Sequence, residues 1–139
     1  MSMRPTTVFA VSAGFMLAAL FTCPSALTAD LNGAWASDLS VCNKVFTKVS
    51  GKMVFAPDSE LYGGGLVVEG KRASGTFQKC TIRSMEDDGA TVHVIAACST
   101  GVMVSDLKLT VKITGDNQIT LSPVGPVDTQ TTYVRCPLQ

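Results

Sequence analysis

Apolar and polar residues alternate along the second half of the chain, most clearly over residues 102–114. One set of alternate positions in this run is apolar: Leu107, Leu109, Val111 and Ile113. The positions between them are polar: Asp106, Lys108, Thr110 and Lys112. A period of two residues puts the apolar side chains on one face of a β-strand. Helical periodicity is absent almost everywhere in the chain, so the sequence predicts an all-β fold.

Eight further segments are predicted to be strands: 33–36, 44–49, 52–56, 66–69, 72–84, 91–99, 118–122 and 129–136. Turn signals such as Ser50-Gly51 and Asp87-Asp88-Gly89 separate them. Short strands with hairpin-sized connections predict an antiparallel meander of about eight or nine strands. Such a meander closes on itself or leaves an exposed edge, so we expect a small barrel, with a two-sheet sandwich as the alternative.

The first 29 residues have the pattern of a cleavable secretory signal. Arg4 is followed by an uncharged apolar run from Val8 to Phe21, which is too short to span a bilayer, and small residues lead to Ala29. We therefore expect a signal peptide over residues 1–29, one domain over residues 30–139, and a periplasmic or secreted protein. In an alternative interpretation Cys23 carries a lipid, although Phe21 and Thr22 depart from the lipoprotein pattern.

The charges of the expected mature domain are nearly balanced. Loss of Arg4 with the signal leaves ten basic against eleven acidic residues. This balance gives no electrostatic basis for binding nucleic acid or an anionic membrane. We expect a monomer that does not insert into a membrane after signal cleavage.

Four cysteines remain after signal cleavage: Cys42, Cys80, Cys98 and Cys136. An even number in a small exported domain predicts disulfides, and the wide spacing does not fit a metal site. Folding a hairpin about Gly89 brings Cys80 opposite Cys98, because Gly89 is the midpoint between them. We therefore predict the Cys80–Cys98 bridge, and by elimination Cys42–Cys136.

The expected first strand contains the sequence Gly33-Ala34-Trp35. A Gly-x-Trp on the first strand resembles the opening of the lipocalin-like calycin barrels. That resemblance implies that Trp35 closes one end of the barrel and that Arg135, near the end of the last strand, packs across its ring.

The opening Leu31-Asn32-Gly33-Ala34-Trp35 also resembles the bacterial periplasmic inhibitors of secreted metalloproteases. Those proteins are small exported eight-stranded barrels with a Cys shortly after the Trp, as Cys42 follows Trp35 here. In them an extended N-terminal segment enters the protease cleft. This chain departs from the pattern in its second cysteine pair, and cleavage after Ala29 would leave almost no residues before the first strand.

Candidate contact residues come from this resemblance and from one loop. Leu61 and Tyr62 precede three glycines, and such a loop can cover the barrel or present itself to a partner. We expect Trp35, Leu61, Tyr62 and Arg135 to contact a ligand or partner. His93 is the only histidine, and no pattern marks an orienting group or a nucleophile beside it, so we expect no enzymatic activity.

The expected function is that of an exported binding module without metal or cofactor, recognising a small apolar ligand or a protein partner at the barrel rim. Side chains alone can fill an eight-stranded barrel, so the rim is favoured over a deep cavity. Inhibition of a secreted protease in the periplasm is the alternative.

Overall fold

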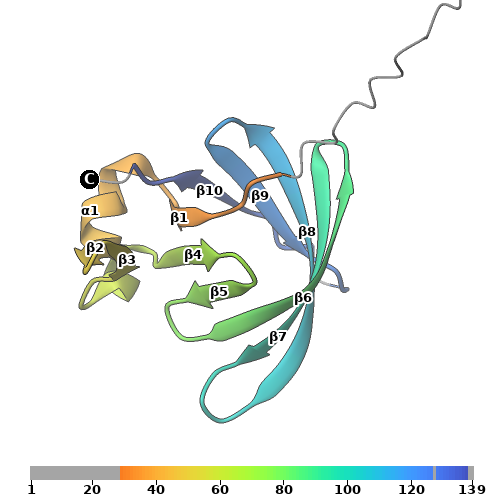
Figure 1. Cartoon of the computed structure of the whole chain (residues 1–139), viewed down its shortest axis with the longest axis horizontal. Helices are drawn as coiled ribbons and strands as arrows, with labels where there is room; N and C mark the ends of the chain where they lie inside the picture. The colour runs from red at the N-terminus through yellow and green to blue at the C-terminus, as the bar shows by residue number, and fades with distance from the viewer. Residues whose placement is uncertain (1–28, 127, 138–139) are drawn as a thin grey trace, which may run out of the picture.

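The computed structural model of the chain describes residues 29–126 and 128–137 (Figure 1). In this part, helix is limited to α1 (Cys42–Val45) and the 3-10 helices η1 (Leu39–Val41) and η2 (Ser59–Tyr62). The strands are β1 (Gly33–Ala36), β2 (Phe46–Val49), β3 (Lys52–Phe55), β4 (Gly65–Glu69), β5 (Arg72–Gly75), β6 (Lys79–Asp88), β7 (Thr91–Ser99), β8 (Val104–Gly115), β9 (Gln118–Pro123) and β10 (Thr131–Arg135). The predicted all-β class is confirmed.

Eight strands form a closed antiparallel barrel in the order β1-β10-β9-β8-β7-β6-β5-β4. From β4 to β10 each strand pairs with its neighbour in the chain, and β1 completes the ring between β4 and β10. Closure leaves no unpaired edge among these strands. The predicted barrel is therefore confirmed, in preference to the sandwich.

Antiparallel pairing puts successive connections at alternate ends of the barrel. The end that we call the floor end carries residues 29–32 and the β4–β5, β6–β7 and β8–β9 turns. The opposite end, the mouth end, carries the β5–β6, β7–β8 and β9–β10 connections and the start of β4. Long hairpins therefore project from both ends of the ring (Figure 1).

A hairpin inserted between β1 and β4 stays outside the barrel, where β2 and β3 pair only with each other (Figure 1). Val45 and Phe46 pack against Ala34, Ala36 and Val67, which belong to a second core cluster apart from the barrel interior. The eight or nine predicted strands thus divide between a barrel and an external hairpin.

Two predicted strands differ from the structure by more than their end residues. The segment 44–49 becomes a strand only at Phe46, because residues 42–45 form α1. The segment 72–84 is two strands, since the amide of Gly75 donates to the carbonyl of Gln78 at 2.9 Å and closes a turn between them. The predicted loop with Leu61 and Tyr62 contains η2.

Both predicted disulfides are confirmed. Cys80 and Cys98 face each other across β6 and β7, with their Cα atoms 4.0 Å apart. Cys42 at the start of α1 is bonded to Cys136, which follows β10, with a Cα separation of 5.7 Å. The first bridge joins neighbouring strands at the barrel wall, and the second fixes the external α1 segment to the end of the last strand.

Candidate functional site

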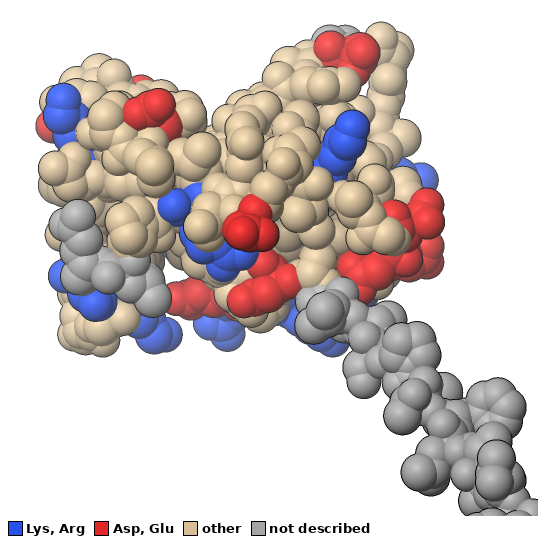
Figure 2. Space-filling view, turned by 90° about the horizontal axis from the view of Figure 1, so that it is seen from above, with Lys and Arg blue, Asp and Glu red and all other residues tan. Residues whose placement is uncertain are grey.

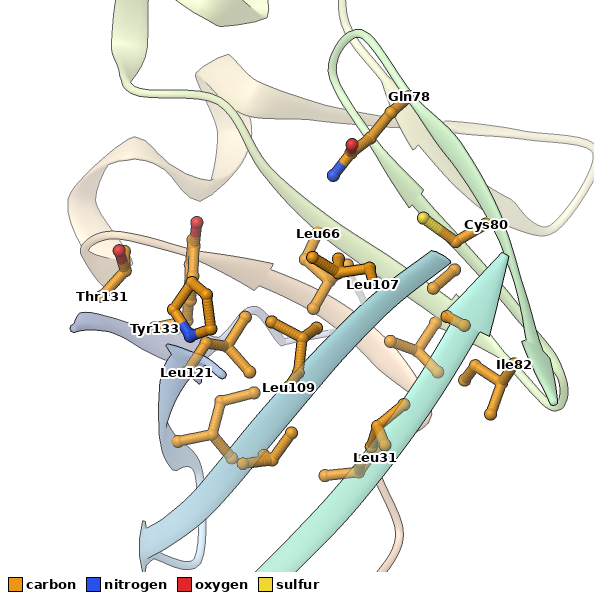
Figure 3. A pocket seen from close by; sticks show the side chains of 18 of the residues that line it. Leu31, Leu66, Gln78, Cys80, Ile82, Leu107, Leu109, Leu121, Thr131 and Tyr133 are labelled. Carbon is orange, nitrogen blue, oxygen red and sulfur yellow. The ribbon is translucent and has the colours of Figure 1, made fainter. Parts of the chain in front are cut away.

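The barrel interior contains a cavity of about 330 Å³. The side chains that line it are mostly aliphatic and come from β4 to β10 and the segment before β1; they include Leu31, Leu66, Ile82, Leu107, Leu109 and Leu121 (Figure 3). No Asp, Glu, Lys, Arg or His of the described residues lines this cavity. Its volume lies at the lower end of the range of ~300–1,000 Å³ typical of ligand pockets.

Small residues at inward positions explain why the interior is not filled. Ala73, Gly75 and Ala96 all line the cavity, and none has a side chain larger than a methyl group. The number of strands favoured the rim over a deep cavity, and the structure shows that the interior does contain one. The sequence reasoning considered the number of strands, whereas the free volume depends on which residues point inward.

Three polar side chains stand where the cavity approaches the mouth end: Gln78, Thr131 and Tyr133 (Figure 3). The Tyr133 ring forms part of the wall, and in Figure 3 its hydroxyl points to the same side as that of Thr131, away from Leu31. Burial raises the pKa of Tyr133 above its usual range. This phenol therefore stays protonated at neutral pH and can donate a hydrogen bond to a ligand at the mouth.

Arg135 and Trp35 close the floor end together. The guanidinium carbon of Arg135 lies 4.3 Å from the centroid of the Trp35 ring, within the range of a cation–π contact. Nη2 of Arg135 donates to the carbonyl of Asp30 at 2.7 Å, and Nη1 donates to the carbonyl of Asn32. Nε1 of Trp35 donates to the carbonyl of Leu31 at 2.9 Å, and only 1% of Trp35 is exposed. The segment before β1 is thereby held across this end.

Leu61 and Tyr62 lie elsewhere, on η2 near the start of β4. Leu61 is exposed, whereas the Tyr62 ring lies under the ammonium of Lys44, 5.1 Å from the ring centroid. The four predicted contact residues therefore form two separate groups, Trp35 with Arg135 and Leu61 with Tyr62. Contact of either group with a ligand or partner stays a prediction.

His93 lies on the outer wall of the barrel. It is paired in register with Glu86 of β6 and Thr110 of β8, so a carboxylate and a hydroxyl lie on neighbouring strands. The side chain is exposed and is not among the residues lining the barrel cavity. The absence of enzymatic activity stays a prediction.

Within residues 29–126 and 128–137, no three His, Cys, Asp or Glu side chains are grouped so that they could hold a metal ion. None of the helices in these ranges has the length and apolar character needed to cross a bilayer.

Comparison with known proteins finds no matching family model, no matching curated protein and no matching solved structure. The candidate site therefore rests on its own geometry.

Sequence reasoning missed the residues at the mouth. Tyr133 lies in a segment predicted to be a strand, and its inward direction follows from its pairing with Ile119, which is buried. The apolar run Val102-Met103-Val104 beside the turn glycine Gly101 was a second available signal, because consecutive apolar residues are unusual in an exposed turn. The inward positions of Leu107 and Leu109, by contrast, follow from the alternation in the sequence.

Proposed function

We propose that this chain is an exported, non-enzymatic binding protein that takes a small apolar ligand into its barrel. The cavity of about 330 Å³, with its aliphatic lining and a few polar groups at one end, carries the proposal. Burial of apolar ligand surface in such a site is favourable because that surface leaves water.

The polar side chains at the mouth define the ligand more closely. The uncharged lining would penalise a ligand with a buried charge. Gln78, Thr131 and Tyr133 offer donors and acceptors for one neutral polar group of the ligand, such as a hydroxyl or an amide. The ligand would therefore place its apolar part toward Leu31 and its polar group at the mouth.

Two further features support this proposal. The contact of Arg135 with the Trp35 ring is the arrangement that a calycin-like barrel would have. The two disulfides fit an oxidising compartment such as the periplasm or the cell exterior. Inhibition of a protease by an N-terminal segment is less well supported, because the carbonyls of Asp30 and Asn32 are held by Arg135.

The test is titration of the exported protein with the neutral apolar fluorophore N-phenyl-1-naphthylamine. Leu107 lines the cavity, whereas Lys108 is exposed at the next position of the same strand. We expect saturable binding by the wild type and by the Lys108→Trp control, and at least about tenfold weaker binding by Leu107→Trp, whose indole would occupy the cavity. Circular dichroism checks that both variants are folded.

Absence of saturable binding by the folded wild type would contradict the proposal. So would equal affinities of Leu107→Trp and Lys108→Trp. If binding is saturable and Leu107→Trp weakens it, mass spectrometry of an organic extract of the protein, purified under native conditions, would identify the ligand class.

A further inference from the structure

Exposed apolar side chains surround the mouth of the cavity. Phe77 on the β5–β6 connection is 75% exposed, and Val102 and Met103 on the β7–β8 connection are 96% and 63% exposed. Val104, at the start of β8, and Val124, after β9, are also exposed. The five residues lie in three connections or, for Val104, directly beside one, all at the mouth end. Clustered exposure of this kind marks an interaction surface in a soluble domain.

The same connections are almost free of charge. The segments 76–78, 100–103 and 124–130 contain no Lys or Arg, and Asp128 is their only acidic residue. The β6–β7 turn at the floor end, in contrast, follows Glu86, Asp87 and Asp88. Acidic side chains gather at the right of Figure 2, the side on which this turn lies in Figure 1. The three mouth-end connections are thus apolar with a single charged residue, Asp128, whereas the β6–β7 turn at the floor end is acidic.

We propose that the mouth end docks on a lipid surface through Phe77, Val102, Met103, Val104 and Val124. Apolar side chains at the tips of loops can enter the boundary between headgroups and acyl chains, where they lose contact with water. Without basic residues in these loops, docking depends on apolar burial and not on anionic headgroups. The surface that fits is therefore a lipid layer, including one with neutral headgroups.

The position of the cavity favours a lipid surface over a protein partner. Gln78 borders the cavity and adjoins Phe77, so the docking loops and the opening lie together. An apolar ligand leaving a docked barrel would pass into the acyl region without crossing water. This last step rests on the proposed function, whereas docking itself does not. A protein partner would instead require a complementary surface of ~800 Å² on each side, with a polar rim.

The test is flotation with phosphatidylcholine vesicles and, in parallel, with vesicles that also contain phosphatidylglycerol. It uses the protein exported by a bacterial host, with its N-terminal residue established by mass spectrometry. The mouth variant is Val102→Ser with Met103→Ser. The control is Val49→Ser with Ile95→Ser, which changes two other exposed apolar side chains, on the outer hairpin and on the outer wall of the barrel.

We expect the wild type and the control to bind both kinds of vesicle with affinities within about twofold. The mouth variant should bind about tenfold or more weakly, because two apolar side chains no longer leave water. Failure to bind neutral vesicles, binding to anionic vesicles alone, or equal losses in the two variants would each overturn the proposal.

Sedimentation velocity tests whether a second copy of the chain, and not a lipid layer, covers the mouth end. A dimer that the mouth variant abolishes, without vesicle binding by the wild type, would assign the surface to a second copy and overturn lipid docking. If the fluorophore fills the cavity but vesicles do not bind, docking is wrong and the proposed function stands. If vesicles bind but the fluorophore does not, the proposed function is wrong and docking stands.

Discussion

Arg135 joins parts of the chain that are more than a hundred residues apart. Its guanidinium covers Trp35 of β1 and binds two carbonyls of the segment before that strand. Gly33 lies so close that a Cβ there would be 3.4 Å from Nη1 of Arg135. The side chain therefore orders the floor of the cavity as well as joining β1 to β10.

We expect Arg135→Ala to lower the free energy of unfolding by about 2–4 kcal/mol, through loss of the cation–π contact and two charge-assisted hydrogen bonds. Urea unfolding followed by the fluorescence of Trp35, the only tryptophan, measures this change. Arg83→Ala is the control, because Arg83 pairs with Asp106 at the surface, where both side chains are about 60% exposed. Its expected cost is below about 1 kcal/mol. Equal losses of unfolding free energy in the two variants would show that the contacts of Arg135 stabilise the fold no more than an exposed surface ion pair does.

Tyr133 gives stability a dependence on alkaline pH. Burial raises its folded-state pKa above the ordinary value of 10.0, so the folded protein holds the phenolic proton more tightly than the unfolded chain does. The resulting stability is complete below pH 10.0 and falls as the pH rises through the folded-state pKa. In urea unfolding at a series of alkaline pH values, Tyr133→Phe should lose stability less steeply than the wild type. Parallel curves would contradict this expectation.

At the scale of the element, β6 contains the irregularity that aligns the barrel disulfide. Asp88 faces Thr91 beside the turn, and uninterrupted pairing from there would place Cys80 opposite Ser99. A β-bulge between Ile82 and Ser84 shifts the register by one residue, so that Cys80 faces Cys98. The predicted pair is confirmed. The prediction placed the centre of the turn at Gly89, half a residue before the observed centre between residues 89 and 90, and it assumed strand pairing without a bulge.

Deletion of Arg83 should leave the Cys80–Cys98 bridge intact. Without this residue Ile82 would directly precede Ser84, and the existing pairs on both sides of the bulge would continue in straight register. Peptide mapping under non-reducing conditions should recover the two cysteines in one cross-linked peptide. Free thiols at Cys80 and Cys98 would show that the bulge itself is required.

The start of β4 permits the external hairpin to approach the barrel. A Cβ at Gly65 would lie 2.5 Å from the carbonyl oxygen of Trp35 and 2.7 Å from the Phe46 ring. We expect Gly65→Ala to cost about 1–3 kcal/mol of unfolding free energy, because backbone and ring must move apart. Gly125→Ala is the control, since nothing lies within 4 Å of a Cβ there, and thermal unfolding compares the two. A Gly65→Ala variant as stable as the control would contradict this close approach.

For the whole molecule, sequence patterns predicted the all-β class, the closure of the barrel and both disulfide bridges. Alternation and turn residues are local properties, and the number of cysteines can be counted directly from the sequence. The external position of β2 and β3 was not predicted, since their alternation resembles that of barrel strands. The cavity was not predicted either. It depends on small residues such as Ala73, Gly75 and Ala96 facing the interior of the same ring, and which residues face one another is known only once the strand register is known.

The two disulfides should contribute unequally to stability. Their sequence separations are 94 for Cys42–Cys136 and 18 for Cys80–Cys98. In the chain-entropy model these loops correspond to about 4.7 and 3 kcal/mol. Replacing Cys42 and Cys136 by Ser should therefore destabilise the protein more than the same change at Cys80 and Cys98, as measured by urea unfolding. The opposite order would show that strain or packing outweighs chain entropy.

The Cys42–Cys136 bridge also determines how the molecule would respond to mechanical force. If the two chain ends were pulled apart, the load would pass from Cys42 to Cys136 through the covalent bond and bypass the residues between them. Only β1 and its flanking segments could be peeled away, extending by at most ~3.5 Å per residue. The other seven strands of the barrel would remain inside the covalent loop, unloaded, and could re-form the wall when β1 returned.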